Sequence, residues 1–315
     1  MGASLPPLRF SYSSQTLESL YADPTVLAVF GFGEVAPADD DPRYLRVGLE
    51  PAASVAAFEV WRSDKPVQHG RSGAIRYATD GDYLYGAIEV EEGAGGIAAA
   101  AEEAYRRLCA FQAAHPCASV LRVWNYMDAI NEGAGDAERY RRFCVGRAQG
   151  MQAFRGDYPA GTAIGRQDSV RILQVYWLAA RTSGRPIENP RQLSAYRYPR
   201  QYGPTPPAFA RAMLTPARQL LISGTAAVVG HASQHIGDPA AQLDETLHNI
   251  DALIATAGVA APDAETLLKL YVRNEADQAN MAALLRGRLP DCPFLVLAGD
   301  VCRAELLLEV DCTLG

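Results

Sequence analysis

The segment GDPAAQLDETLHNIDALIATAG, residues 237–258, decides the fold of the last third of this 315-residue chain. Apolar residues recur in it every three or four positions, and this spacing predicts a helix over Ala240–Ala257 with one apolar stripe. Gly258 follows the helix at the position where a left-handed glycine commonly ends one. An apolar stripe has to be buried against another element, so we expect a sheet beside this helix. The stripe consists of Leu243, Leu247, Ile250 and Ile254.

Short apolar runs on both sides of this helix predict the strands of that sheet. One run, Leu220–Ser223, precedes the helix, and a second helix, Glu275–Arg288, lies among the later runs. Two helices among several strands indicate a sheet with both helices on one face. The later predicted strands are Leu267–Val272, Phe294–Ala298 and Leu306–Asp311.

The first half of the chain contains similar elements. Its first third has the pattern of antiparallel sheet, with the turn Asp80-Gly81-Asp82 joining the last two strands. An alanine-rich helix is predicted over Ile97–Ala114 and a second helix over Asp136–Phe154, with a strand after each of them. The predicted strands are Val26–Phe32, Tyr44–Gly48, Ser54–Val60, Ala74–Ala78, Tyr83–Glu89, Val120–Tyr126 and Val170–Ala180.

The chain is longer than one typical domain, so we predict two α+β domains, each a mixed sheet with helices packed on one face. We place them at residues 1–155 and 156–315. A stretch rich in proline and aromatic residues, Gly184–Pro216, has too many prolines for regular structure. A loop of this length is usually functional or disordered, and its tyrosines and arginines favour a position beside the cleft between the domains.

The composition excludes several classes of function. A net charge of −7 lacks the positive field that a nucleic-acid partner requires. No stretch approaches 18 uninterrupted apolar residues and the amino terminus lacks a signal-peptide pattern, so we expect a cytoplasmic protein. The six cysteines contain no CxxC pair, and His231 and His235 lie outside any predicted helix, so we expect no metal site.

Several longer segments resemble known families. The segment 237–258, LKLYVRNEAD (268–277) and CRAELLLEVD (302–311) resemble the small RidA/YjgF-like (chorismate mutase-like) fold in order and spacing. Four further segments extend the likeness over essentially the whole chain, which resembles the chorismatase family of two RidA-like domains. They are LRVWNYMDAINEG (121–133), ERYRRFCVGRAQG (138–150), ENPRQLSAYRYPRQYGP (188–204) and SGTAAVVGHASQH (223–235).

The resemblance implies an enzyme that cleaves the enolpyruvyl ether of chorismate to pyruvate and 3-hydroxybenzoate. Within the family, the segments look closest to members that also give 4-hydroxybenzoate, for xanthomonadin-type pigment and quinone synthesis. The resemblance implies no metal and no organic cofactor, with chorismate as the partner and neither nucleic acid nor membrane bound. The chain would be a monomer of two pseudo-symmetric halves, or a weak oligomer.

The resemblance places the catalytic glutamate at Glu309, and the strand pattern supports an unusual environment for it. Leu306, Leu308 and Val310 alternate onto the face that helices would cover, which turns Glu309 and Leu307 to the opposite face. A carboxyl beside leucines is desolvated, which raises its pKa and helps it remain an acid. From the strand alone, the alternative is a structural carboxylate on a half-solvated sheet face.

The resemblance also matches Cys302, seven residues earlier, to a cysteine near the substrate ring; a structural cysteine is the alternative. Guanidinium groups bind carboxylates in bidentate fashion, so Arg147 and Arg211 are candidates for the substrate carboxylates, with surface salt bridges as the alternative. Tyr198 and Tyr202 are candidate hydroxyl donors or ring caps, or packing residues of the long loop.

Small residues at Gly224-Thr225-Ala226 and Gly230 would let a ligand approach the backbone closely, or mark a kink in a strand. Gly230 is the glycine that we select for substrate binding.

Other functions remain open on the sequence. The same acid could hydrolyse chorismate to a dihydroxycyclohexadiene carboxylate, and a RidA-like module could bind a ligand without catalysis. Small RidA proteins deaminate imines or enamines with an arginine before the last pair of strands. Counting back from Glu309 leads to Phe294 at that place, which argues against deamination.

Overall fold

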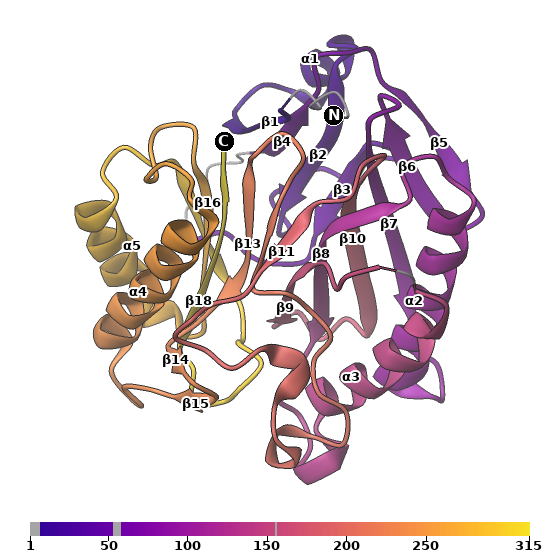
Figure 1. The fold of residues 1–315 in the computed structure, drawn as a ribbon. Helices are drawn as coiled ribbons and strands as arrows, with labels where there is room; N and C mark the ends of the chain where they lie inside the picture. The colour runs from indigo at the N-terminus through magenta and orange to yellow at the C-terminus, as the bar shows by residue number, and fades with distance from the viewer. Residues whose placement is uncertain (1–6, 53–57, 155) are drawn as a thin grey trace.

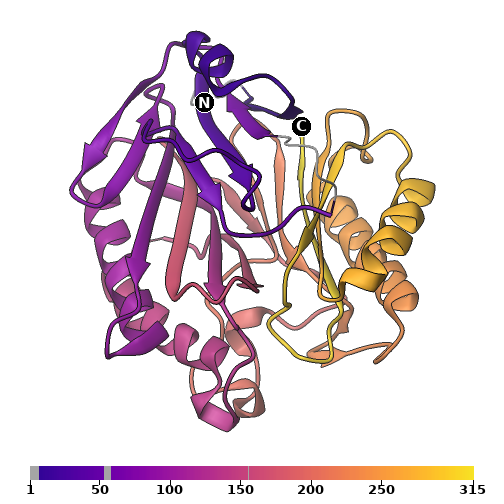
Figure 2. The ribbon, with the colours of Figure 1, turned by 180° about the vertical axis from the view of Figure 1, so that it is seen from behind.

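The computed structural model describes residues 7–52, 58–154 and 156–315. This part of the chain forms two six-stranded sheets, one four-stranded sheet and a two-stranded hairpin (Figure 1). Seen from the front and from behind, the two layers of long helices lie on opposite outer sides of the molecule, with the sheets between them (Figure 2).

The first six-stranded sheet has the strand order β5-β6-β7-β10-β8-β9. Neighbouring strands are antiparallel except for β8 and β9, which are parallel. Helices α2 (Gly96–Ala113) and α3 (Arg139–Gly150) share one apolar core with this sheet. The strands are β5 (Gln68–Ser72), β6 (Ile75–Thr79), β7 (Tyr83–Glu91), β8 (Ser119–Asp128), β9 (Ala160–Arg166) and β10 (Ile172–Ala180).

The second six-stranded sheet has the order β11-β12-β13-β18-β16-β17, again with one parallel pair, β16 and β17. Helices α4 (Pro239–Ala257) and α5 (Glu275–Arg288) share a core with one face of it. The strands are β11 (Arg185–Ile187), β12 (Ala212–Leu214), β13 (Leu220–Thr225), β16 (Leu267–Val272), β17 (Phe294–Ala298) and β18 (Leu308–Leu314).

The two sheets have the same connectivity. If the six strands of each are numbered in chain order, both sheets read 1-2-3-6-4-5, with a long helix after the third strand and another after the fourth. Strands β9 and β10 belong to the first sheet, although both follow the expected boundary between residues 155 and 156. The first repeat ends with β10 at Ala180 and the second begins with β11 at Arg185.

The four-stranded sheet precedes both repeats and has the order β1-β4-β2-β3. The prediction of one antiparallel sheet in the first third is wrong, because β2 and β3 are parallel and the predicted hairpin, β6 with β7, belongs to the first repeat. The predicted strand Ser54–Val60 overlaps β4, but residues 54–57 lie outside the described residues. The elements are β1 (Arg9–Ser13), α1 (Leu17–Ala22), β2 (Val26–Phe32), β3 (Tyr44–Val47) and β4 (Phe58–Arg62).

Periodicity predicted the helices of the second repeat well. Helix α5 and strand β17 have the predicted bounds, and α4 begins one residue before its prediction. Gly258 adopts φ 67°, the left-handed conformation expected of a helix-ending glycine. Helix α3 is shorter than predicted because Glu138, with ψ 135°, is not helical. The ends of the predicted helix are instead 3₁₀ turns, η1 (Gly135–Ala137) and η2 (Met151–Ala153).

The sheet faces that the long helices leave uncovered meet in a shared apolar core. Aromatic side chains from all three sheets fill it, and the rings of Trp124 and Tyr176 stack at 4.8 Å between centroids. The second repeat contributes Tyr271 of β16 to this core. The faces that appear solvent-directed when each repeat is considered alone are therefore buried against each other.

Candidate active site

A cavity of about 470 Å³ is lined by residues of both repeats. Its walls come from α3, β9, β13, the long loop and the segment that leads into β18. The long loop 184–216 borders the cavity as predicted. It is not wholly irregular as expected, because β11 and β12 lie at its two ends and the 3₁₀ turns η3 (Ala195–Arg197) and η4 (Arg200–Tyr202) lie between them. The lining includes Arg147, Thr162, Arg211, Gly224, Cys302 and Glu309.

Glu309 lies on β18 and lines the cavity, on the face away from α4 and α5. Leu308 and Val310 belong to the helix-covered core as predicted, whereas Leu306 precedes the strand and joins a separate apolar cluster. Only 5% of Glu309 is exposed, and none of the described residues hydrogen-bonds its carboxyl. Burial, then the charge of Asp311, raises the pKa of Glu309 to about 8. Glu309 is thus a carboxylic acid at neutral pH.

Gly224 of β13 makes room for this acid. A Cβ at residue 224 would overlap the Glu309 carboxyl and lie 3.2 Å from Thr162 Oγ1. The Gly224 N–H donates to Thr162 Oγ1 at 3.0 Å, which ties β13 to β9. Of the glycines named from the sequence, Gly224 is approached closely by a side chain, whereas a Cβ at Gly230 would meet nothing within 4 Å.

Arg147 of α3 is a buried cation without a counter-ion. It is 3% exposed, and its guanidinium lies over the ring of Tyr105 at 4.9 Å. Its Nε and Nη2 atoms have no hydrogen-bond partner, and no carboxylate among the described residues pairs with it. An unpaired buried charge is costly, so this arrangement calls for an anion from the cavity.

Arg211, just before β12, is a second cation of the cavity. Its Nη2 donates to the backbone oxygen of Leu193 at 2.8 Å and to Tyr198 Oη at 2.7 Å. Its Nε atom is buried without a partner, and none of the carboxylates in the described ranges forms an ion pair with it. Arg147 and Arg211 together offer the cavity two sites for anionic groups.

Tyr202 belongs to the wall that closes one side of the cavity. Its hydroxyl donates to the backbone oxygen of His231 at 2.7 Å, and the guanidinium of Arg303 lies 4.0 Å from its ring centroid. Arg303 also lies over the ring of Tyr198 at 5.1 Å. The Tyr202 hydroxyl donates within the protein, whereas the Tyr198 hydroxyl accepts from Arg211 and retains a proton that it can donate to a ligand.

Cys302 lines the same cavity and is partly exposed. Burial, then the nearby charge of Glu309, raises the pKa of its thiol to about 12. At neutral pH it is a thiol, which lacks the nucleophilic power of a thiolate. It can contact a ligand as a small polarizable group.

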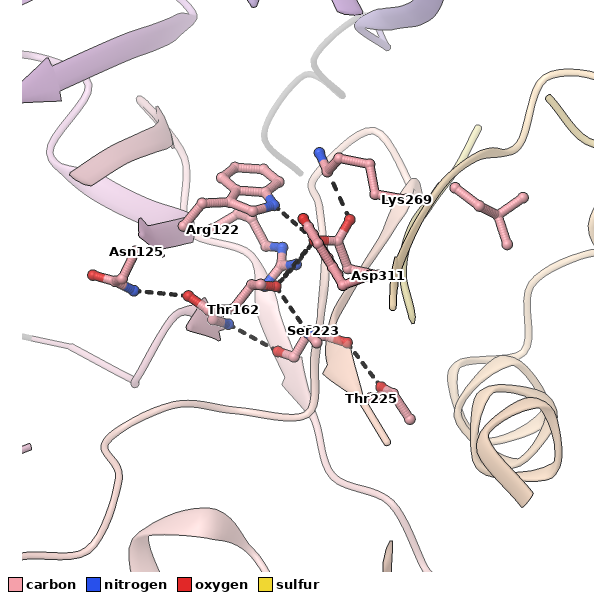
Figure 3. Close-up of polar contacts among 12 residues, drawn as sticks. Arg122, Asn125, Thr162, Ser223, Thr225, Lys269 and Asp311 are labelled. Atoms are coloured by element: carbon pink, nitrogen blue, oxygen red, sulfur yellow. Dashed lines mark hydrogen bonds and ion pairs between the residues drawn. The ribbon is translucent and has the colours of Figure 1, made fainter. Parts of the chain in front are cut away.

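A cluster of charged residues, which includes Arg122, Lys269 and Asp311, lies close to Thr162 (Figure 3). Asp311 of β18 pairs with Arg122 of β8 at 3.3 Å, and Lys269 of β16 binds Glu59 of β4 at 2.9 Å. Thr162 Oγ1 lies between this cluster and the cavity, since it accepts from Arg122 Nη2 at 2.6 Å and donates to Asp311 Oδ2 at 3.1 Å.

The structure brings most of the predicted site residues together and leaves one apart. Gly230, with φ 58°, turns the hairpin of β14 (Val228–Val229) and β15 (Ala232–Ser233) and lies outside the cavity wall. His231 and His235 have different partners. His235 Nε2 contacts Glu245 Oε2 at 3.2 Å, and His231 contacts Tyr202. Among the described residues, no group of three or more His, Cys, Asp or Glu could hold a metal ion.

Three wall residues were missed or misjudged from the sequence. Thr162 is a single hydroxyl residue in a strand of mainly small and apolar residues, and Gly224 was passed over for Gly230. Arg303 directly follows Cys302 in the segment that carries the family resemblance, but we tested Phe294 instead. Phe294 begins β17 and packs under Arg286, outside the cavity wall.

None of the helices in the described ranges combines the length and the apolar character needed to cross a bilayer.

Comparison with known proteins identifies the family. The model for "Chorismatase FkbO/Hyg5-like, N-terminal" matches residues 59–179, ending within β10. A 3-hydroxybenzoate synthase of Streptomyces hygroscopicus is 37% identical over 288 residues, 85% of this chain and 84% of that protein. A chorismatase of Streptomyces rapamycinicus is 36% identical over 316 residues, 93% of each. A crystal structure of a chorismatase, 30% identical, superposes over the whole of both chains with a TM-score of 0.86.

These matches confirm the predicted family, and the two repeats with helices on one face of each sheet confirm the predicted fold class. With identities above 30% over more than two thirds of each relative, the chain belongs to the chorismatase family, enzymes that act on chorismate.

Proposed function

We propose that this enzyme releases pyruvate from chorismate and forms 3-hydroxybenzoate, with 4-hydroxybenzoate as a second product. The observation that carries the proposal is a protonated carboxyl, Glu309, beside two arginines that have no carboxylate partner among the described residues. Chorismate has two carboxylates and an acid-labile enol ether. Two cations and one acid in a single cavity fit this substrate.

Glu309 gives its proton to the methylene carbon of the enol ether, which leaves an oxocarbenium ion. The bond between the ether oxygen and the ring then breaks, and that oxygen leaves as the keto oxygen of pyruvate. For the 3-isomer, the oxygen of the neighbouring ring hydroxyl bonds to the electron-poor carbon and gives up its proton, which restores the acid and leaves an arene oxide. The bond from this oxygen to its original carbon then breaks, and a proton moves from the ring carbon to the oxygen to give the aromatic product. For the 4-isomer, the hydroxyl stays in place, and loss of the proton on its own carbon gives the aromatic product and restores the acid. Pyruvate and hydroxybenzoate together contain the atoms of chorismate, so the reaction needs no co-reactant.

The rate should depend on pH as the protonation of Glu309 does. Its pKa is raised to about 8, so the fraction of proton-carrying enzyme falls as pH rises through that value. We expect kcat/KM to decline about tenfold per pH unit above this pKa, which gives the pH profile an alkaline limb. Arg211 lowers the pKa of Glu309 in the free enzyme, and a substrate carboxylate bound to Arg211 would offset that effect. The limb in kcat should therefore lie at higher pH than the limb in kcat/KM.

Initial rates of pyruvate release from pH 6 to pH 10 measure both limbs. A profile of kcat/KM that stays flat through pH 10 would remove Glu309 as the acid.

Chromatography of the product tests the reaction and the role of Cys302 together. Incubation with chorismate should give equal amounts of pyruvate and of hydroxybenzoate, mainly the 3-isomer. Cys302→Ala should change the proportion of products more than the amount of pyruvate, because the thiol contacts the ring and does not supply the proton. Cys312→Ala, the same change in the helix-covered core, is the matched control and should leave the proportions unaltered.

A dihydroxycyclohexadiene carboxylate as the sole product would identify simple hydrolysis instead. Binding of chorismate without pyruvate release would reduce the chain to a ligand-binding module.

A further inference from the structure

The charged cluster close to Thr162 contains two carboxylates, Glu59 and Asp311, and two cations, Lys269 and Arg122. All four side chains are at most 5% exposed. The charges balance without Glu309, so an ionised Glu309 would add a negative charge to a buried and already neutral cluster. Burying an unbalanced charge is strongly unfavourable.

Asp311 is held in one position by donors from three strands. Its Oδ2 accepts from Trp124 Nε1 at 3.0 Å, from Tyr271 Oη at 2.8 Å and from Thr162 Oγ1 at 3.1 Å. Lys269 Nζ lies 3.7 Å from the other oxygen. These partners are all donors, as suits a carboxylate with its charge.

Asp311 also lies next to Glu309. The two residues are two apart on β18, so their side chains project from the same face of the sheet. Thr162 is close to both carboxyls. Its hydroxyl donates to Asp311, and the same oxygen lies 3.2 Å from the position of a Cβ on residue 224, which would overlap the Glu309 carboxyl. The fixed negative charge therefore acts on Glu309 over a short distance and in a dry environment.

We propose that Asp311 is a positioning residue for the reaction, whose fixed negative charge keeps the proton on Glu309 in the resting enzyme and draws a proton back to Glu309 after turnover. This inference rests on the proposed role of Glu309 as the acid. Asp311 itself does not line the cavity, so it acts through Glu309 and not on the substrate.

Every element packed around Glu309 contributes to its charge environment. Asp311 lies on the same strand as Glu309 and favours its neutral form, as burial does. Arg122 of β8 and Arg211 before β12 favour its ionised form. Cys302 and Tyr140 also face Glu309, but burial raises the pKa of both and keeps them neutral in the working pH range. Arg147 completes the charged groups of the wall.

The test compares Asp311→Asn with Glu59→Gln. Both changes remove one negative charge from the same cluster, and both carboxylates contact Lys269, but only Asp311 neighbours Glu309. The measurement is the pH profile of kcat/KM for pyruvate release from chorismate. We expect Asp311→Asn to move the alkaline limb to lower pH by about one unit or more, and Glu59→Gln to leave it in place.

An unmoved limb in folded Asp311→Asn, or an equal shift in both variants, would overturn the inference. If Asp311→Asn alone fails to fold, the test uses Asp311→Asn combined with Lys269→Met. This double variant retains one carboxylate and one cation in the cluster, and it should shift the alkaline limb in the same direction. A limb at the wild-type position in this double variant would equally overturn it. Failure of the proposed function is distinguishable, because Glu309→Gln would then release pyruvate at the wild-type rate whatever Asp311 does.

Discussion

Glu309→Gln should lower kcat for pyruvate release by about 10²–10⁴-fold, the usual contribution of a general acid. Glutamine matches the shape of the protonated carboxyl but has no acidic proton to transfer to carbon. Binding of chorismate should persist, because the substrate carboxylates are assigned to Arg147 and Arg211. Steady-state kinetics together with calorimetric titration of chorismate would separate the two effects.

Glu305→Gln is the matched comparison, since Glu305 is another carboxyl of the cavity wall and accepts a hydrogen bond from Ser233. It should lower kcat far less than Glu309→Gln. Equal losses in the two variants would show that the wall, and not one acid, was disturbed.

Arg147→Met should raise KM for chorismate by about 10- to 150-fold, which corresponds to the roughly 1.5–3 kcal/mol of a hydrogen-bonded charged contact. The change in kcat should be small, because Arg147 binds a carboxylate that does not react. The free enzyme should become more stable to heat, since the buried guanidinium has unpartnered Nε and Nη2 atoms and methionine removes an uncompensated charge.

Arg142→Met is the control for Arg147→Met, because Arg142 lies on the exposed side of the same helix. It should change neither KM nor the melting temperature appreciably. An unchanged KM in Arg147→Met, with a fold intact by circular dichroism, would exclude this arginine from the substrate site.

The sequence predicted local structure best where one periodicity governs a whole element. Helices α4 and α5 show a helical repeat, so their bounds were predicted within one residue. Which sheet a strand joins depends on distant partners, and this information is absent from the strand itself. Strand β10 pairs with β7 and β8 across long connections, so its membership of the first repeat was missed.

The site was predictable in part for the same reason. Glu309 stands at an alternate position of an apolar strand, a pattern visible in one short segment. Lys269 and Asp311 stand at equivalent alternate positions, but a charged residue there normally indicates a solvated face. Only the packing of one sheet face against another buries them, and that packing has no signature in either strand.

The two repeats have one strand order, yet each presents different side chains to the cavity between them. A symmetric pair of identical subunits would have to present every residue of such an interface twice. Joining the repeats in one polypeptide removes that restriction, because each half can change its facing surface independently. The first repeat supplies Arg147 and Thr162 to the cavity, and the second supplies Glu309, Cys302 and Arg211. Covalent linkage thus lets two copies of one architecture present different residues to one cavity, and residues of both copies are needed to line it.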